Sequence, residues 1–163
     1  MTAPLNVLIL CTGNSARSIL GEMLFNHLGQ GRIKAYSAGS KPGGIVNPVA
    51  LETLTTHGVP CAGSRSKSWD EFAQPGAPEF DFIFTVCSNA ANETCPVWPG
   101  HPTTAHWALP DPAHVEPLAA RREAFEQAYQ SLMARIAAFL ALPLETMPRA
   151  DALAAARKIH EDF

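Results

Sequence analysis

A cysteine and an arginine, separated by five small or polar residues, follow a short apolar run near the start of the chain. The segment is Asn6-Val-Leu-Ile-Leu-Cys11-Thr-Gly-Asn-Ser-Ala-Arg17-Ser18. Such residues favour a tight loop whose backbone N–H groups converge with the N-terminus of a following helix, an arrangement that binds anions. The same environment favours a thiolate, so we expect the pKa of Cys11 to lie below the free value of about 8.5. Arg17 adds a planar fork for two oxygens of a tetrahedral anion.

Ser18 stands one residue beyond the arginine. Its hydroxyl is expected to donate a hydrogen bond to the thiolate, which stabilises the charged form. The alternative is that Cys11 is an inert core residue at the end of a strand. An inert cysteine does not require Gly13, Asn14 and Ser15 after it, or an Arg-Ser pair six residues on. The pattern therefore favours a nucleophile in an anion-binding loop.

Cys87 and Cys95 are candidates for the same site. Cys87 directly follows a strand-like apolar run, and parallel strands present their carboxyl ends at one edge of a sheet, so Cys11 and Cys87 are expected to face one crevice. Cys95 stands eight residues later. If the segment between them were helical, the two cysteines would be about 12 Å apart, whereas a disulfide needs Cα atoms within about 7 Å. Closing this bond would require the segment to unwind, so we expect a mobile redox segment.

An inert buried pair and a metal site are the alternatives for these two cysteines. A structural zinc site usually has closely spaced pairs among four ligands, and the six histidines are scattered without that spacing. We therefore expect no metal. Cys61 and the histidines outside the motifs have no assigned role.

The hydrophobic pattern predicts the elements that position these residues. Strand-like runs alternate with helical ones, which implies right-handed crossovers and a parallel sheet, and therefore an α/β fold with a three-layer α/β/α sandwich. Asn47 is expected to cap a helix that starts at Pro48. The expected strands are the run before Cys11, residues 33–38 and residues 80–86, and the expected helices are residues 19–28, 48–57, 117–140 and 149–160. The apolar face of the long helix is formed by Leu118, Phe125, Ala128, Leu132, Ile136 and Phe139. For the last helix, packing on its own domain and packing on a partner both stay open.

Composition narrows the class of protein. The 163 residues suit one domain with a continuous core, and the net charge is −3. Because no basic run marks a nucleic-acid or membrane surface, we expect neither partner. No stretch reaches the roughly 20 apolar residues of a membrane span, and no leader sequence is recognisable. Four cysteines without a dense disulfide pattern fit a reducing compartment, so we expect a cytoplasmic protein.

These residues resemble the Cys-x5-Arg-Ser loop of the low-molecular-weight protein tyrosine phosphatase superfamily, and the resemblance covers most of residues 5–142. Within the superfamily the chain is most similar to the arsenate reductases. That similarity rests on Tyr36-Ser37-Ala38-Gly39-Ser40, Val86-Cys87-Ser88-Asn89, Cys95-Pro96, His106-Trp107 and Asp111-Pro112. The resemblance implies a flavodoxin-like sheet of four parallel strands. It also implies a catalytic domain over residues 1–142 and a helical extension over residues 143–163.

The resemblance further implies an activity, the reduction of arsenate to arsenite without a cofactor. Cys11 would form the arsenic adduct and Asp111 would be the general acid. Cys87 and then Cys95 would take over the oxidation in a disulfide relay, which thioredoxin or glutathione with glutaredoxin resets. The substrate-binding residues would be those of the loop, Thr12, Gly13, Asn14, Ser15, Ala16, Arg17 and Ser18.

Two other functions stay open. A low-molecular-weight protein tyrosine phosphatase would use the same loop, but its family commonly has aromatic residues after the aspartate, where this chain has Ala113-His114, and a second cysteine in the loop, where this chain has Ala16. A non-enzymatic anion or thiol-redox sensor would have no need of Asp111.

Some reductases also carry a monovalent cation site. Asn14, Glu22 and Ser37 match three of its ligands, but Ser68 stands where an aspartate is expected. We therefore expect weakened cation binding. One hypothesis is that the ammonium of Lys67 takes the place of the cation near Glu22, and a Lys67 that points to solvent would exclude it.

Overall fold

A computed structural model describes residues 3–86 and 104–163, so Cys87 and Cys95 lie outside the described residues. The elements are β1 (Leu5–Cys11), α1 (Arg17–Gly29), β2 (Ile33–Gly39), α2 (Pro48–Thr56), the 3-10 helix η1 (Trp69–Phe72), β3 (Phe82–Thr85), β4 (Thr104–His106), α3 (Leu118–Leu140) and α4 (Arg149–Asp162). Within these ranges no helix is both long and apolar enough to cross a membrane.

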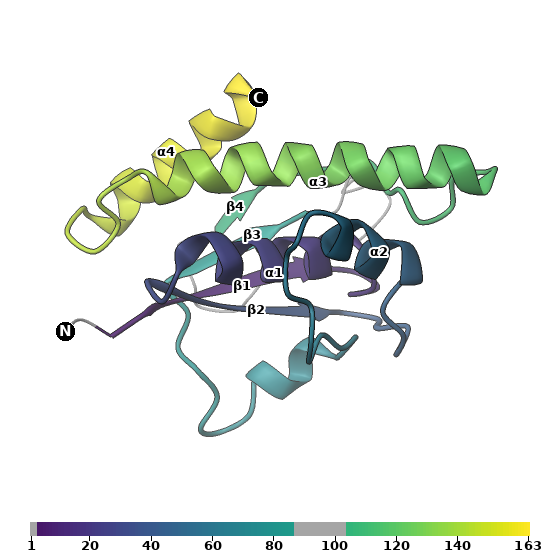
Figure 1. Cartoon of the computed structure of the whole chain (residues 1–163). Coiled ribbons are helices and arrows are strands. Elements are labelled where there is room, and N and C mark those ends of the chain that lie inside the picture. The colour runs from purple at the N-terminus through teal and green to yellow at the C-terminus, as the bar shows by residue number, and fades with distance from the viewer. Residues whose placement is uncertain (1–2, 87–103) are drawn as a thin grey trace.

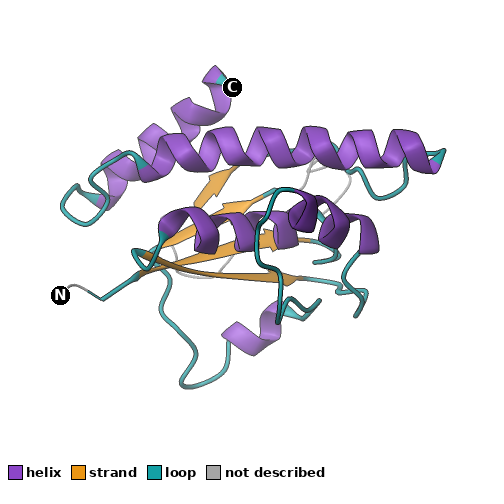
Figure 2. Ribbon diagram, viewed as in Figure 1, coloured by secondary structure: helices purple, strands orange, loops and turns teal. Residues whose placement is uncertain are grey.

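The four strands form one parallel sheet in the order β2-β1-β3-β4 (Figures 1 and 2). Cys11 pairs with Gly39 at the carboxyl ends of β1 and β2, and Leu10 pairs with Thr85 of β3. These ends form the edge at which ligands bind in open α/β sheets. The predicted α/β fold with a four-stranded parallel sheet is therefore confirmed.

Side chains of β1 alternate between the two faces of the sheet, as expected for a strand buried on both sides. Val7, Ile9 and Cys11 enter the main core, which α1 and α3 cover, and Leu8 and Leu10 enter a smaller core on the other face. Partly buried residues of β2 and η1 pack against that smaller core. Figure 2 shows the long helices above the sheet and η1 below it.

Local sequence rules explain where the helices begin and end. The Asn47 side chain accepts a hydrogen bond of 2.9 Å from the backbone N–H of Val49, and Pro48 is the first residue of α2, so the predicted cap is confirmed. α1 ends where Gln30 and Gly31 adopt positive φ, at 45° and 87°. On α3 the predicted apolar face is buried except for Leu118, which is 42% exposed. That assignment was wrong: Leu118 is the first residue of the helix and is not part of the core formed by the described residues.

The C-terminal helix α4 packs on its own chain, against α3 and β4. Ala152 and Ala156 are its buried residues, and the Trp107 indole N–H donates a hydrogen bond of 2.9 Å to the carbonyl of Ala156. The sequence left open whether this helix packs on its own domain or on a partner, and in the structure it packs on its own domain. The boundary between residues 142 and 143 stays a prediction.

Candidate active site

The loop that joins β1 to α1 lines a cavity of about 280 Å³ at the carboxyl edge of the sheet. Cys11 lies at the end of β1, where it is 4% exposed. The cavity brings together residues far apart in the sequence: Cys11, Thr12, Gly13, Ser15, Ala16, Arg17, Asn47, Asp111, Ala113 and His114. The predicted nucleophile, arginine and general acid therefore share one cavity.

Backbone hydrogen bonds brace the loop from the segment that follows β2. The N–H groups of Lys41, Gly43 and Asn47 donate to the carbonyls of Thr12, Gly13 and Ser15, at 2.9, 3.2 and 2.9 Å. These bonds occupy carbonyl oxygens, the loop groups that would repel an anion. From the sequence, Asn47 was predicted only as a helix cap. In the structure its backbone N–H also holds the loop, and Asn47 lines the cavity.

The chain approaches the loop closely at Gly39, where a Cβ atom would lie 2.4 Å from the Thr12 carbonyl oxygen. Ser66 adds a hydrogen bond from its hydroxyl to the Gly13 carbonyl, at 3.1 Å. Neither residue had a role that the sequence predicted. Gly39 belongs to a stretch that carries the family resemblance, and Ser66 has no recognisable motif.

Arg17 is held in place by two carbonyl groups at the edge of the sheet. Its Nη1 donates to the carbonyls of Leu109, at 3.0 Å, and Val86, at 3.4 Å. Its Nη2 lies 3.7 Å from Oδ2 of Asp111. Because the side chain of Arg17 is only 8% exposed, its charge acts in a region from which water is largely excluded.

Asp111 lies on the loop between β4 and α3. Its Oδ1 accepts a hydrogen bond of 3.0 Å from the N–H of Ala113, and its Oδ2 lies 4.0 Å from Nε2 of His114. Its side chain is 39% exposed. Asp111 therefore has a carboxylate that one hydrogen bond orients and that stays accessible, as a general acid requires.

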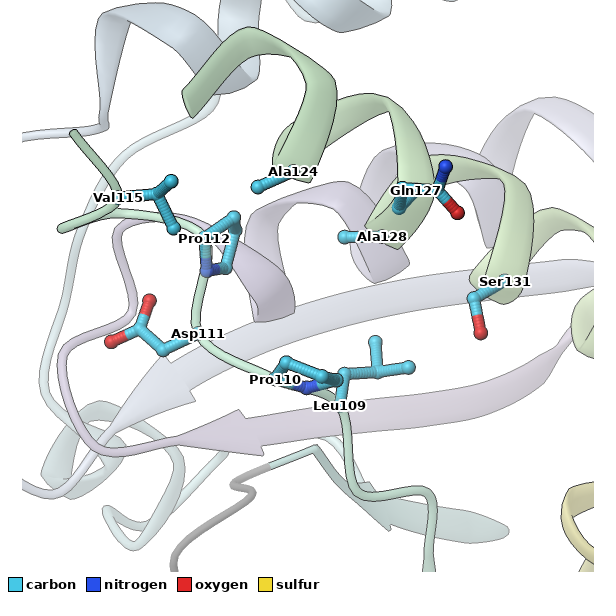
Figure 3. Close-up of a pocket in the computed structure, with 9 residues that line it drawn as sticks. All are labelled: Leu109, Pro110, Asp111, Pro112, Val115, Ala124, Gln127, Ala128 and Ser131. Carbon is cyan, nitrogen blue, oxygen red and sulfur yellow. The ribbon is translucent and has the colours of Figure 1, made fainter. Parts of the chain in front are cut away.

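A second cavity, of about 390 Å³, lies between the Asp111 loop and α3 (Figure 3). Asp111 is at one end of the labelled residues and Ser131 is at the other. The lining is mostly apolar: Leu109, Pro110, Pro112, Val115, Ala124, Gln127 and Ala128 accompany these two residues. No arginine or lysine stands among these described lining residues, so an oxyanion is better accommodated in the cavity of the Cys11 loop.

A buried polar network supports the loop from behind. The Asn14 amide Nδ2 donates to the hydroxyls of Ser18, at 2.8 Å, and Ser37, at 2.9 Å. Its Oδ1 accepts from the backbone N–H of Lys67, at 2.9 Å. The structure thus places the Ser18 hydroxyl as an acceptor, and its expected donation to the Cys11 thiolate stays a prediction.

Lys67 is buried beside Glu22, as the sequence hypothesis requires. Its Nζ lies 3.6 Å from Oε1 of Glu22, and the two side chains are 6% and 13% exposed. Burial raises the pKa of Glu22, while the Lys67 ammonium and the Ser37 hydroxyl oppose that rise. Burial also lowers the pKa of Lys67, against the attraction of Glu22. The Ser68 hydroxyl instead accepts from the backbone N–H of Asp70 and caps η1.

Cys61 is partly buried outside the cavity, and its Sγ lies 3.8 Å from the Thr55 hydroxyl. Cys87 and Cys95 fall in the range that the structure does not describe. Among residues 3–86 and 104–163, no group of three or more His, Cys, Asp or Glu side chains is arranged to hold a metal ion.

Comparison with known proteins agrees with this geometry. The family model for low molecular weight phosphotyrosine protein phosphatase matches residues 6–149. An arsenate reductase of Shouchella clausii is 32% identical over 134 residues, which cover 82% of this chain and 93% of that protein.

Solved structures have the same fold. An arsenate reductase from Archaeoglobus fulgidus has a TM-score of 0.62 at 27% identity, covering 80% of this chain and 98% of that chain. A low molecular weight phosphotyrosine phosphatase from Vibrio cholerae has a TM-score of 0.61 at 24% identity, covering 79% and 90% of the two chains, and this likeness shows the fold alone. With a family model matched over residues 6–149 and the loop, arginine and aspartate in one cavity, the chain belongs to the low molecular weight phosphotyrosine protein phosphatase family.

Proposed function

We propose that this protein reduces arsenate to arsenite. The observation that carries the proposal is the meeting of Cys11, Arg17 and Asp111 in one cavity, with Arg17 and Asp111 3.7 Å apart. The name of the relative from Shouchella clausii, an arsenate reductase 32% identical to this chain, supports the same substrate. We place the protein in the cytoplasm because its chemistry needs reduced thiols.

In the proposed first step, arsenate binds to the loop N–H groups and the guanidinium of Arg17. The Cys11 thiolate attacks arsenic, and an As–S bond forms as an As–O bond breaks. Asp111 gives a proton to the departing oxygen, which leaves as water. Arsenic is still in its +5 state in this adduct, so the step transfers no electrons.

Electrons are transferred when a second thiol attacks the Cys11 sulfur. In the proposal this thiol is Cys87: a Cys11–Cys87 disulfide forms, the As–S electron pair stays on arsenic, and arsenite leaves in the +3 state. Cys95 then attacks Cys87 and frees Cys11. Thioredoxin, or glutathione with glutaredoxin, reduces the final Cys87–Cys95 disulfide. No bound cofactor or metal takes part in this sequence.

A tyrosine phosphatase is the second candidate, favoured by the family and by the same three cavity residues. The residues that follow Asp111 argue against it. Ala113 and His114 line the cavity, and neither supplies the broad aromatic surface that grips a phosphotyrosine ring. A pure sensor is disfavoured too, because it would not need a carboxylate held beside Arg17.

Arsenate turnover by the purified protein tests the proposal. The protein should release arsenite with one of the two reducing systems, and Cys11→Ser should release none because a serine hydroxyl is almost wholly protonated at neutral pH. Cys61→Ser is the matched control, since Cys61 lies outside the cavity, and it should keep full activity. Arsenite release by Cys11→Ser above background would contradict the assignment, as would failure of the wild type with both systems.

A further inference from the structure

The Lys67–Glu22 pair is buried, although neither residue lines the cavity of the Cys11 loop. Burying two charges carries a large desolvation cost, and an apolar pair of similar size often gives equal or greater stability. Stability alone therefore does not account for this pair. Its place directly behind the loop suggests that it positions the loop.

Oxygen atoms surround the Lys67 ammonium. Its Nζ lies 3.0 Å from the carbonyl of Arg65, 3.5 Å from the hydroxyl of Ser37 and 3.6 Å from Oε1 of Glu22. Carbonyl, hydroxyl and carboxylate oxygens are also what hard cations bind in proteins. Arg65 itself is turned to Glu71, with Nη2 to Oε1 at 2.8 Å, so Lys67 is the cation in direct contact with Glu22 among the described residues.

A continuous set of hydrogen bonds connects this pair to the loop. The backbone N–H of Lys67 can only donate, so the atom of Asn14 that faces it must be the acceptor Oδ1. The Asn14 Nδ2 group is then the donor to the hydroxyls of Ser18 and Ser37. Ser37 in turn donates its hydroxyl hydrogen to Glu22. That donation requires Glu22 to be an acceptor. An ionised carboxylate can only accept, whereas a protonated Glu22 could also donate to Ser37. Ionisation therefore fixes Ser37 as the donor to Glu22 and leaves its oxygen as an acceptor for Asn14.

Asn14 is the loop residue whose conformation depends on these hydrogen bonds. It belongs to the loop and has a φ of 46°, in the left-handed region that non-glycine residues adopt at a cost. Its side chain is fully buried. The hydrogen bonds of its amide to Ser18, Ser37 and Lys67 compensate for this backbone conformation.

We propose that Lys67 is a positioning residue for the Cys11 loop, a cation supplied by the chain itself. Its ammonium keeps Glu22 ionised. The ionised carboxylate thereby holds Asn14 and Ser18 in the positions in which the loop binds an oxyanion and stabilises the Cys11 thiolate. The inference relies on the proposed function only for the identity of that loop. It predicts that removal of the ammonium creates a need for a monovalent cation from solution.

The test measures the loop without arsenate reduction. Iodoacetamide alkylation of Cys11 is followed by mass spectrometry of the peptide that ends at Arg17, which contains no other cysteine. Protection by inorganic phosphate reports oxyanion binding. All measurements use choline chloride as the reference salt, and potassium or ammonium chloride replaces it at equal concentration.

In choline chloride, Lys67→Met should alkylate Cys11 more slowly and bind phosphate more weakly, each by about tenfold, on the scale of one lost charge-assisted hydrogen bond. Potassium or ammonium should restore both. The wild type should not respond to the exchange of salts, and neither should Lys158→Met, which removes an exposed lysine of α4. A purely structural role would lower stability without this rescue.

A double variant covers the case in which Lys67→Met does not fold. Glu22→Gln with Lys67→Met removes both charges, and the glutamine carbonyl can still accept from Ser37. It should bind phosphate within a few-fold of the wild type and show no cation response. The proposal would be overturned if the double variant bound phosphate in choline chloride as weakly as Lys67→Met does, or tenfold more weakly than the wild type where Lys67→Met does not fold.

Two other results would also overturn it: Lys67→Met behaving as the wild type in choline chloride, or potassium acting equally on both proteins. Failure of the proposed function gives a different result. In that case the wild type itself would show no phosphate protection of Cys11, or would show it without releasing arsenite.

Discussion

The guanidinium of Arg17 and the carboxylate of Asp111 lie 3.7 Å apart in the cavity that both residues line. Their environments differ, since the arginine side chain is 8% exposed and the aspartate side chain 39%. Two backbone carbonyls fix the arginine, and the N–H of Ala113 orients the aspartate beside it. The pair therefore presents a buried cation and an accessible carboxylate to an oxyanion that enters the cavity.

Asp111→Asn should slow formation of the arsenic adduct by about 10² to 10⁴, the usual effect of removing a positioned general acid. Oxyanion binding should persist, because Arg17 keeps its two carbonyl partners. Single-turnover measurement of adduct formation separates this step from the later thiol steps. Asp70→Asn, on the exposed side of η1, is the matched control. An unchanged single-turnover rate in Asp111→Asn would exclude this residue as the acid.

Gly39→Ala should weaken phosphate binding by about tenfold to a hundredfold. The added Cβ would lie 2.4 Å from the Thr12 carbonyl oxygen and 3.1 Å from Asn14 Cβ, so the loop must shift, at a cost of about 1–3 kcal/mol. Phosphate protection of Cys11 against alkylation measures the effect. Gly43→Ala is the control, because a Cβ there would meet no atom of the described residues within 4 Å, its chain neighbours aside. Equal binding by the two variants would show that the close approach at Gly39 does not position the loop.

The strand, loop and helix around Cys11 could be predicted because all their determinants are contiguous. The apolar run, the small residues and Arg17 lie within one short segment, and each has a local preference for its observed conformation. The cap at Asn47 was predictable for the same reason. Local chemistry predicts both features, and for the loop, tertiary hydrogen bonds complete the conformation.

Other features depend on contacts between distant residues. The carbonyls that hold Arg17 belong to Val86 and Leu109, 69 and 92 positions away, and every residue has a carbonyl, so no motif marks them. The strand β4 is three residues long, too short for a periodic pattern. The packing of α4 uses two buried alanines, which carry little hydrophobic contrast in the sequence. Lys67 was located from the resemblance, whereas its bond to Asn14 required the structure.

Arg32→Met should lower the free energy of unfolding by about 1–2 kcal/mol at neutral pH. Arg32 donates to the carbonyl of Leu140, the last residue of α3, at 2.7 Å and to that of Leu142, just beyond the helix, at 3.2 Å. It also donates to both carboxylate oxygens of Glu145. The lower end of the range is favoured, since Arg32 and Glu145 are about a third exposed (38% and 31%) and water screens the pair. Urea unfolding measures the difference, and no change would mean that the contacts are not stabilising.

The same pair predicts a dependence on pH. The hydrogen bond from Arg32 lowers the pKa of Glu145 from 4.5 to about 2. A carboxyl with a depressed pKa in the folded state contributes stability above pH 4.5 and loses it as the pH falls toward about 2. The stability difference between the wild type and Glu145→Gln should therefore be constant above pH 5.5 and shrink below pH 4.5. A difference that grows on acidification would contradict the assignment.

The order of the cysteine relay predicts which disulfide each variant accumulates. If Cys87 resolves the Cys11 adduct, Cys87→Ser should stop arsenate reduction but leave phosphate-ester hydrolysis largely intact, since hydrolysis needs only the loop, Cys11 and Asp111. Cys95→Ser should complete one turnover and accumulate the Cys11–Cys87 disulfide, whereas the wild type without reductant should accumulate Cys87–Cys95. Mass spectrometry of non-reduced peptides distinguishes the two disulfides, with Cys61→Ser as the control that changes neither. If Cys95→Ser turned over repeatedly with thioredoxin, the external thiol would have to attack the first disulfide directly, and two cysteines would suffice for the relay.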